Sequence, residues 1–324
     1  MSREKNQTLS IGFMGDIMIG RLVNEVIAEK GYEYPWGDTL DLIRASDLRI
    51  INLETTLTQH TEKNPKVFNF RALPDRVKTL KIAGIDVANL ANNHILDFKD
   101  AGLMETIATL DAADILHIGA GMNSKQAKKP TIISKNNFKI GIIGYTDNEL
   151  TWKATATTPG TNYIQVGDIK TIKEQIDAIR PSVDIIIVTC QWGPNMRQQP
   201  SQEFIHYAHA IIDSGADIIH GHSAHIFQGI ELYKNKIILY DTGDFIDDYA
   251  VDPALRNDQS FYFEITVSRK GPERVKLTPV IISNMQVNRA TGNEKKEIML
   301  KMQQLSKEMN TIIPDDGILI IDHN

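Results

Sequence analysis

Several apolar β-type runs in this chain end at side chains that can bind a metal ion or carry a proton. These side chains are Asp16, Glu54, Asn93, His94, Gln191, His222 and His225. Helix-patterned segments separate the runs, so the sequence predicts a layered α/β fold. Because the carboxyl ends of strands share one edge of the sheet in such folds, we expect residues far apart in sequence to converge on one cleft. Carboxylate, carboxamide and imidazole ligands together suit zinc, manganese or iron(II).

The densest group of such residues lies between positions 217 and 248. Three of the nine histidines, His220, His222 and His225, fall within six residues after an apolar run, and four aspartates follow a predicted hairpin. Neutral imidazole is a common ligand of zinc-like metals and carries protons near neutral pH. The plainer interpretation is a solvated polar loop with one histidine packed against the sheet.

Composition limits the class of protein. The chain has 324 residues, of which 42% are hydrophobic, and a net charge of -6, which gives no reason to expect a nucleic-acid or anionic-membrane partner. The single cysteine, Cys190, excludes an internal disulfide and a multi-cysteine zinc site. The amino terminus is polar, and the sequence has no run of about 18 apolar residues. We therefore expect a soluble, cytoplasmic protein.

The order of the elements indicates one domain. After Asp248 the pattern changes to an antiparallel pair, over 261–267 and 275–282, followed by a helix from Asn293 to about Met309. We expect a single domain over 1–324, with a motif-bearing core at about 8–265 and a C-terminal elaboration at 266–324.

Seven motifs occur in order between Gly12 and about Phe263. They are Gly15–Arg21, Asn52–Glu54, Phe68–Arg71, Asn89–Asp97, Gln191–Gly193, His220–Glu231 and Tyr240–Phe245. Together they resemble the bacterial capsule synthesis protein family, CapA-like proteins associated with poly-γ-glutamate and a branch of the calcineurin-like metallophosphoesterase superfamily. The resemblance implies a four-layer α-β-β-α sandwich of the metallo-dependent phosphatase type, with metals at the strand ends.

The resemblance also implies roles for individual residues. Asp16 resembles a ligand of the first metal that also takes part in catalysis. Glu54 resembles a bridging carboxylate, and His94 resembles the histidine that protonates the leaving group. The other implied metal ligands are Asn93, Gln191, His222 and His225. The implied substrate-binding residues are Arg71, which would hold a carboxylate or phosphate, and more weakly Arg21 and Trp192.

Each assignment has a structural alternative. Asp16 could be a turn residue, Glu54 a surface acid, and Asn93 a helix N-cap. Arg71 could pair with an acid of its loop, and the weaker substrate-binding residues could be a solvated charge and a packed aromatic.

The chain departs from the family pattern at several positions. Gln191 stands where the family has histidine, and an amide oxygen is a poorer zinc ligand than imidazole. Asp244 stands where relatives often have asparagine, and His220 has no assigned role. Met18 occupies the place of a ligand histidine of phosphoesterases, although methionine is usual there in the capsule-type branch. We therefore expect one or two divalent ions, manganese, iron or zinc.

These features predict a metal-dependent hydrolase that attacks an ester or amide, a phosphoester or γ-glutamyl bond, with metal-bound hydroxide. A divalent cation lowers the pKa of its bound water from about 16 toward about 7. The expected partner is a small-molecule or polyglutamate-type substrate, and the sequence predicts no oligomeric state. The alternative is a non-catalytic accessory or binding protein for poly-γ-glutamate capsule synthesis with a degenerate metal site; a purely structural α/β protein is a third.

Overall fold

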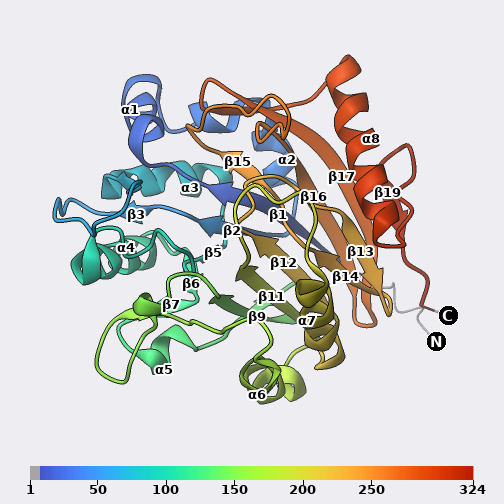
Figure 1. Cartoon of the computed structure of the whole chain (residues 1–324), viewed down its shortest axis with the longest axis horizontal. Coiled ribbons are helices and arrows are strands. Elements are labelled where there is room, and N and C mark those ends of the chain that lie inside the picture. The colour runs from blue at the N-terminus through green and yellow to red at the C-terminus, as the bar shows by residue number, and fades with distance from the viewer. Residues whose placement is uncertain (1–7, 324) are drawn as a thin grey trace.

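The computed structural model describes residues 8–323, whose longest strands form two sheets (Figure 1). The larger has nine strands in this range, in the order β18-β17-β16-β1-β2-β5-β6, with β15 paired to β1 and β19 to β17. Their bounds are β1 (Leu9–Ile17), β2 (Leu48–Leu53), β5 (Val87–Asn89), β6 (Leu116–Ile118), β15 (Asp244–Ile246), β16 (Gln259–Ser268), β17 (Gly271–Ser283), β18 (Gln286–Arg289) and β19 (Ile318–Ile320).

The smaller sheet has six strands in the same range, in the order β13-β14-β12-β11-β9-β8. Their bounds are β8 (Thr131–Lys135), β9 (Phe138–Thr146), β11 (Ile185–Gln191), β12 (Ile218–His222), β13 (Ile230–Tyr233) and β14 (Lys236–Leu239). Two short ladders lie outside the main sheets: β3 (Thr56–Leu57) with β4 (Arg71–Ala72), and β7 (Ala120–Gly121) with β10 (Gly160–Thr161).

Helices cover both outer faces of the paired sheets (Figure 1). Helices α1 (Arg21–Lys30), α2 (Leu40–Arg44), α3 (Val77–Ala83) and α4 (Lys99–Ala112) share an apolar cluster with the larger sheet. Helices α6 (Ile169–Ile179) and α7 (Gln202–Asp213) share another with the smaller sheet. The short helix α5 (Ser124–Ala127) lies beside β7 and β10.

A third apolar cluster joins the inner faces of the two sheets. Phe13 and Ile50 of the larger sheet belong to it with Ile142 and Ile187 of the smaller sheet, and all four are fully buried. Strands buried on both faces have few polar positions, which explains why the sequence shows continuous apolar runs here. The four-layer α-β-β-α sandwich predicted from the sequence is therefore confirmed.

The C-terminal part extends the larger sheet. The predicted antiparallel pair is β16 and β17, and the predicted helix is α8 (Gly292–Glu308), whose Met302 packs in the cluster between the sheets. The boundary expected near residue 265 falls inside β16, so the core and the elaboration share one sheet.

Parallel pairing determines where the polar strand ends meet. In the larger sheet β1, β2 and β5 are parallel, and in the smaller sheet β9, β11 and β12 are parallel. Among residues 8–323, no helix is long and apolar enough to cross a membrane. Residues 1–7, on which the expectation of a cytoplasmic protein partly rests, lie outside the described range.

Candidate metal centre

Asp16 and Asp244 are neighbours because β1 pairs with β15. The parallel register places Asp16 opposite Asp244, and the backbone N–H of Asp16 donates to the carbonyl of Gly243 (2.9 Å). A Cβ on Gly15 would lie 1.9 Å from that carbonyl oxygen, so the close approach requires glycine at this position. The Gly-Asp motif thus brings two fully buried carboxylates side by side.

His225 joins these two carboxylates from the turn that follows β12. Its Nδ1 lies 2.9 Å from Oδ1 of Asp244 and 3.2 Å from Oδ2 of Asp16. Ser223 (φ 119°) and His225 (φ 59°) both have left-handed backbones, a strained arrangement that costs roughly 1–3 kcal/mol per residue and concentrates at functional sites. Together the three residues Asp16, His225 and Asp244 offer ligand atoms that all lie within 4.8 Å of one another.

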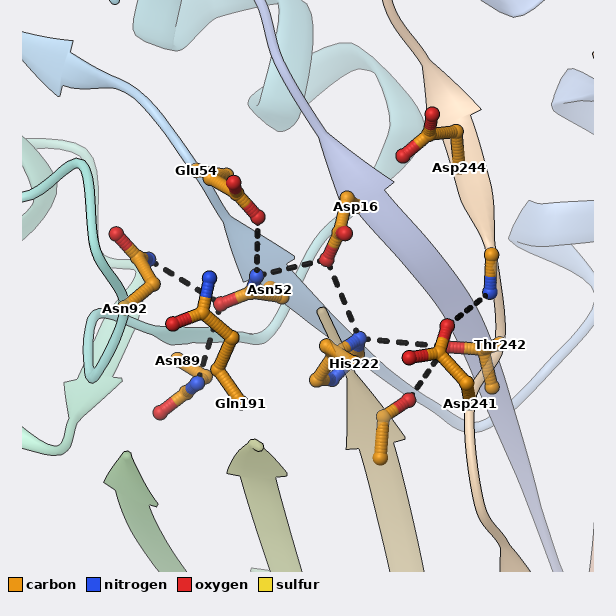
Figure 2. A network of polar contacts seen from close by, with 12 residues as sticks. Asp16, Asn52, Glu54, Asn89, Asn92, Gln191, His222, Asp241, Thr242 and Asp244 are labelled. Atoms are coloured by element: carbon orange, nitrogen blue, oxygen red, sulfur yellow. Dashed lines mark hydrogen bonds and ion pairs between the residues drawn. The ribbon is translucent and has the colours of Figure 1, made fainter. Parts of the chain in front are cut away.

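Glu54 is held beside Asp16 by Asn52. Figure 2 shows the Asn52 amide between the two carboxylates, where its Nδ2 donates to Oδ1 of Asp16 (2.7 Å) and Oε2 of Glu54 (3.1 Å). Its own carbonyl accepts from the amides of Asn89 (3.1 Å) and Asn92 (3.2 Å). Residues two apart in an extended chain point to the same side, which explains the Asn-Leu-Glu spacing.

The centre carries more negative charge than its protein partners balance. Asp16 Oδ2, Glu54 Oε1 and Asp244 Oδ2 are buried and accept no hydrogen bond from the described residues. Burial and the neighbouring Asp16 raise the pKa of Glu54 well above its usual value, and burial does the same for Asp244.

The same negative charge changes the pKa of His225. Burial alone would lower the pKa of His225, but the carboxylates of Asp244 and Asp16 raise it well above its ordinary value. Buried carboxylate oxygens beside an imidazole are the donor set that a divalent transition metal prefers. The residues therefore fit a metal ion.

His94 lies at the rim of this centre. Its Nδ1 is 2.6 Å from Oδ2 of Asp97, and its Nε2 is 3.7 Å from Oε1 of Glu54. The ring packs edge-on against Phe70, with centroids 4.3 Å apart. Burial lowers the pKa of His94, against the opposing effect of Asp97. An imidazole that donates its Nδ1–H to a carboxylate directs Nε2 toward the site.

Gln191 and Asn93 lie together, but they bind each other. Gln191 Nε2 donates to Asn93 Oδ1 (2.7 Å), and Gln191 Oε1 accepts from the Asn93 backbone N–H (3.0 Å). The alternative role of Asn93 as a helix N-cap is absent within the described residues, since the next helix, α4, begins at Lys99 with Phe98 in the N-cap position.

Two of the histidines differ in their surroundings. Figure 2 shows His222 between Asp16, whose Oδ1 is 3.4 Å away, and Thr242. The hydroxyl of Thr189 contacts the other ring nitrogen of His222. His220 instead places Nε2 at 3.0 Å from the Met14 carbonyl on the other sheet and is fully buried. His220 is thus the packed histidine of the plainer interpretation, and it links the two sheets.

Two of the three predicted substrate-binding residues share a surface pocket. Arg21 and Arg71 line a cavity of about 380 Å³ together with Lys63. Arg21 pairs with Asp248 (3.2 Å), and Arg71 donates to the His60 carbonyl (2.9 Å).

Trp192 does not point into this pocket. It is 5% exposed, stacks on Tyr240 and donates its indole N–H to the Tyr240 carbonyl (2.8 Å). In the structure Trp192 is therefore a packed aromatic that does not line the arginine pocket, and substrate binding by this residue stays a prediction.

Sequence reasoning gave no role to several residues that shape the centre. They are Asn52, Asp97, Asp241 and Asp244. Asp241 accepts the N–H groups of Ala224 (2.7 Å) and Gly243 (2.8 Å), which ties the histidine turn to the segment before β15. Of these four, Asp97 could have been identified from the sequence, because it follows His94 by three residues just before a helix.

Comparison with known proteins places the chain in a sequence family. The profile "Bacterial capsule synthesis protein PGA_cap" matches residues 10–249. A probable polyglutamine synthesis accessory protein of Mycobacterium tuberculosis is 29% identical over 362 residues, covering 95% of this chain and 94% of its own length. The capsule biosynthesis protein CapA of Bacillus anthracis is 32% identical over 254 residues, covering 76% of this chain and 62% of that protein.

Solved structures support the fold. The 5'-nucleotidase precursor from Thermus thermophilus superposes with a TM-score of 0.51 at 14% identity, over 95% of this chain and 61% of that one. The likeness is one of fold, and it agrees with the metallo-dependent phosphatase type of sandwich expected from the sequence.

Proposed function

We propose, since the chain belongs to the bacterial capsule synthesis protein family, that it is a metal-dependent hydrolase acting on a phosphoester or γ-glutamyl bond. One observation carries this proposal: the buried carboxylates of Asp16, Glu54 and Asp244 gather around His225, whose Nδ1 lies 3.2 Å from Asp16 and 2.9 Å from Asp244. Such an arrangement is costly without a cation and is a suitable metal site with one.

The ligands for this ion would be Asp16, Asp244 and His225, with Glu54 beside them. A divalent ion supplies Lewis acidity and lowers the pKa of coordinated water toward about 7. Asn52 orients Asp16 and Glu54 through its two donated hydrogen bonds, so their remaining oxygens are fixed before an ion or substrate arrives. Manganese, iron and zinc all suit this mixture of carboxylate and imidazole.

As an imidazolium, with its Nδ1–H held by the Asp97 carboxylate, His94 would donate its Nε2 proton to the leaving oxygen or nitrogen and return to the neutral Nδ1–H form. Asp97 holds the imidazole with Nδ1 at 2.6 Å, and the Nε2 edge faces Glu54 at 3.7 Å. General acid catalysis of this kind contributes roughly a hundred- to ten-thousand-fold. Phe70 packs against the ring and restricts its rotation.

Arg21 and Arg71 would hold an anionic part of the substrate. The Arg21 guanidinium lies 5.1 Å from the centroid of the Phe70 ring, and the same ring contacts His94. The Phe70 ring therefore contacts both Arg21, which lines the pocket, and His94, the proposed proton donor. A planar guanidinium binds carboxylates and phosphates through paired donors, so both proposed substrate classes suit it.

The test is a screen of phosphomonoesters, phosphodiesters and γ-glutamyl compounds with manganese, iron and zinc. Asp16→Ala and His94→Ala are expected to lose metal-dependent turnover while retaining the circular dichroism spectrum of the wild type. His206→Ala, on the exposed side of α7, is the matched control and should keep full activity. Turnover that survives both Asp16→Ala and His94→Ala would contradict the proposal.

A second candidate function is a non-catalytic accessory protein for capsule polymer synthesis. It is favoured by Gln191, which stands where the family has histidine and whose amide is engaged by Asn93. This candidate predicts binding of a polyanionic polymer without metal-dependent turnover of any compound in the screen.

A further inference from the structure

The metal ligands expected from the sequence separate into two groups in the structure. The first group is Asp16, Glu54 and His225, which Asp244 joins, and each of the three carboxylates keeps one oxygen that accepts no hydrogen bond from the described residues. In the second group, Asn93, Gln191 and His222, the atoms that would face an ion are engaged by other protein groups. This division bears on how many ions the site can bind.

The side-chain carbonyl oxygen of Gln191, Oε1, accepts hydrogen bonds from three donors. It accepts from the Asn93 backbone N–H (3.0 Å), the Thr146 hydroxyl (3.2 Å) and the Asn148 amide (3.4 Å). Gln191 is 1% exposed, so these contacts are made away from water. To bind a cation, the oxygen would have to abandon buried donors, which costs about 1–3 kcal/mol for each donor left unpaired.

The side-chain oxygen of Asn93, Oδ1, also accepts a hydrogen bond from a protein donor. It accepts from Gln191 Nε2 (2.7 Å), so the two side chains form a reciprocal pair together with the Asn93 backbone N–H. An ammonium group, Lys66 Nζ, donates to the Asn93 backbone carbonyl next to this pair and lies 3.0 Å from Oδ1 of Asp97. The ion pair of Lys66 with Asp97 thus holds the backbone beside the amide pair in place.

His222 completes the second group. Its Nε2 lies 3.2 Å from the Thr189 hydroxyl, its Nδ1 lies 3.2 Å from the Thr242 hydroxyl, and the side chain is fully buried. Each ring nitrogen therefore has a hydroxyl partner, and either hydroxyl can donate or accept. By contrast, the unsatisfied oxygens of the first group all belong to carboxylates on the side of β1, β2 and β15.

We propose that this chain binds a single divalent ion through Asp16, Asp244 and His225, and that the Gln191–Asn93 amide pair occupies the other half of the site in place of a second ion. The inference rests on the proposed function in that it assumes a metal centre. In this arrangement Gln191 is a positioning residue: it fastens the residue before His94 to the end of β11.

The test is a measurement of metal stoichiometry and affinity on the full chain. Chelator-stripped protein is titrated with Mn(II) and with Zn(II) by calorimetry, and bound metal is counted by elemental analysis after gel filtration. Wild type should bind one equivalent. Gln191→Leu and Asn93→Ala should also bind one equivalent, with affinities within about threefold of wild type, because neither residue is a ligand. Asp244→Asn should bind at least tenfold more weakly.

Gln165→Leu, the same substitution at an exposed position, is the matched control, and circular dichroism checks that each variant is folded. Two equivalents in wild type, or loss of metal in both Gln191→Leu and Asn93→Ala with the fold retained, would overturn the single-ion inference while leaving the hydrolase proposal intact. A folded wild type that binds neither metal would overturn both.

Discussion

Oδ2 of Asp97 lies 2.6 Å from Nδ1 of His94, and the same oxygen accepts the backbone N–H of Phe70 at 2.7 Å. Lys66 lies 3.0 Å from the other oxygen of Asp97. The carboxylate is thus held on both oxygens before it orients the imidazole. A carboxylate accepts only, so Nδ1 carries the proton in this hydrogen bond and the tautomer of the neutral ring is fixed.

Asp97→Asn is expected to disturb the tautomer of His94 rather than substrate binding. With its amide oxygen in the place of Oδ2, the asparagine turns its NH₂ group toward the Lys66 ammonium, and it no longer has the negative charge that favours Nδ1–H. We expect kcat to fall roughly a hundredfold with KM changed less than about threefold, using the substrate found in the screen. Nitrogen-15 NMR of the imidazole gives a second readout that does not depend on turnover.

Asp100→Asn provides the control for this prediction, because Asp100 is an exposed aspartate in the first turn of α4. An Asp97→Asn protein with wild-type kcat and an unchanged imidazole spectrum would show that Asp97 does not orient His94.

Removal of the ion is expected to destabilise the protein. An ion that binds only the folded state adds about 2.7 kcal/mol to the free energy of unfolding when its concentration is about a hundred times its Kd. A chelator should therefore lower Tm by about 5 °C, since about 2–4 °C corresponds to 1 kcal/mol in domains somewhat smaller than this one. Readdition of manganese or zinc should restore it, as differential scanning calorimetry would show.

Asp244→Asn should not destabilise the metal-free protein, although loss of the ion destabilises wild type. The substitution removes one of the crowded buried charges but keeps an oxygen for the Nδ1–H of His225. With chelator present we expect the variant to be at least as stable as wild type, and with metal present to gain less. A variant less stable than wild type in both conditions would mean that Asp244 serves the fold and not the ion.

The sequence contains enough information for part of this site. Parallel strands end at one edge of a sheet, so the positions of Asp16, Glu54 and His222 after apolar runs were sufficient to predict that they meet. The imidazole of His225 was predicted from the same loop. These inferences depend on local periodicity and on the topology of α/β sheets, both of which a single sequence records.

Other parts of the site depend on contacts that periodicity cannot show. Asp244 reaches Asp16 only because the three-residue strand β15 pairs with β1, more than 200 residues away in sequence. Gln191 and Asn93 are 98 residues apart, and whether their amides bind each other or an ion depends on side-chain geometry. The residue after a strand end can point to either side of the sheet, and the ring of Trp192 packs against Tyr240.

Asp147 gives the protein a pH dependence of stability that is separate from the metal ligands. Burial raises the pKa of Asp147 to about 6, although its Oδ1 accepts the Gly193 N–H (3.1 Å). The pKa of an unfolded aspartate is about 3.9. Between these values the folded state retains a proton that the unfolded state has lost, so the contribution of Asp147 to stability is largest below about pH 4 and falls as the pH rises to about 6.

Asp147→Asn should remove this dependence, since the amide oxygen still accepts the Gly193 N–H without carrying a charge. Relative to wild type, we expect the variant to gain about 2 kcal/mol in free energy of unfolding between about pH 4.5 and about pH 7.5. Urea unfolding of both proteins in the presence of chelator measures the difference. An equal response of the two proteins to pH would show that Asp147 is ionised in the folded state throughout this range.

Gly15→Ala tests whether the approach of β15 to β1 builds the centre. The new Cβ would lie 1.9 Å from the Gly243 carbonyl oxygen, so β15 must move away and carry Asp244 with it. Overpacking of this kind costs about 3 kcal/mol, and metal affinity should fall at least tenfold because two of the ligands separate.

Gly292→Ala is the control for the general cost of replacing glycine. Gly292 has φ 56°, but no atom lies within 4 Å of the new Cβ. This variant should therefore lose about 1 kcal/mol of stability with its metal affinity unchanged. A folded Gly15→Ala protein that binds metal as tightly as wild type would show that Asp244 is not one of the ligands.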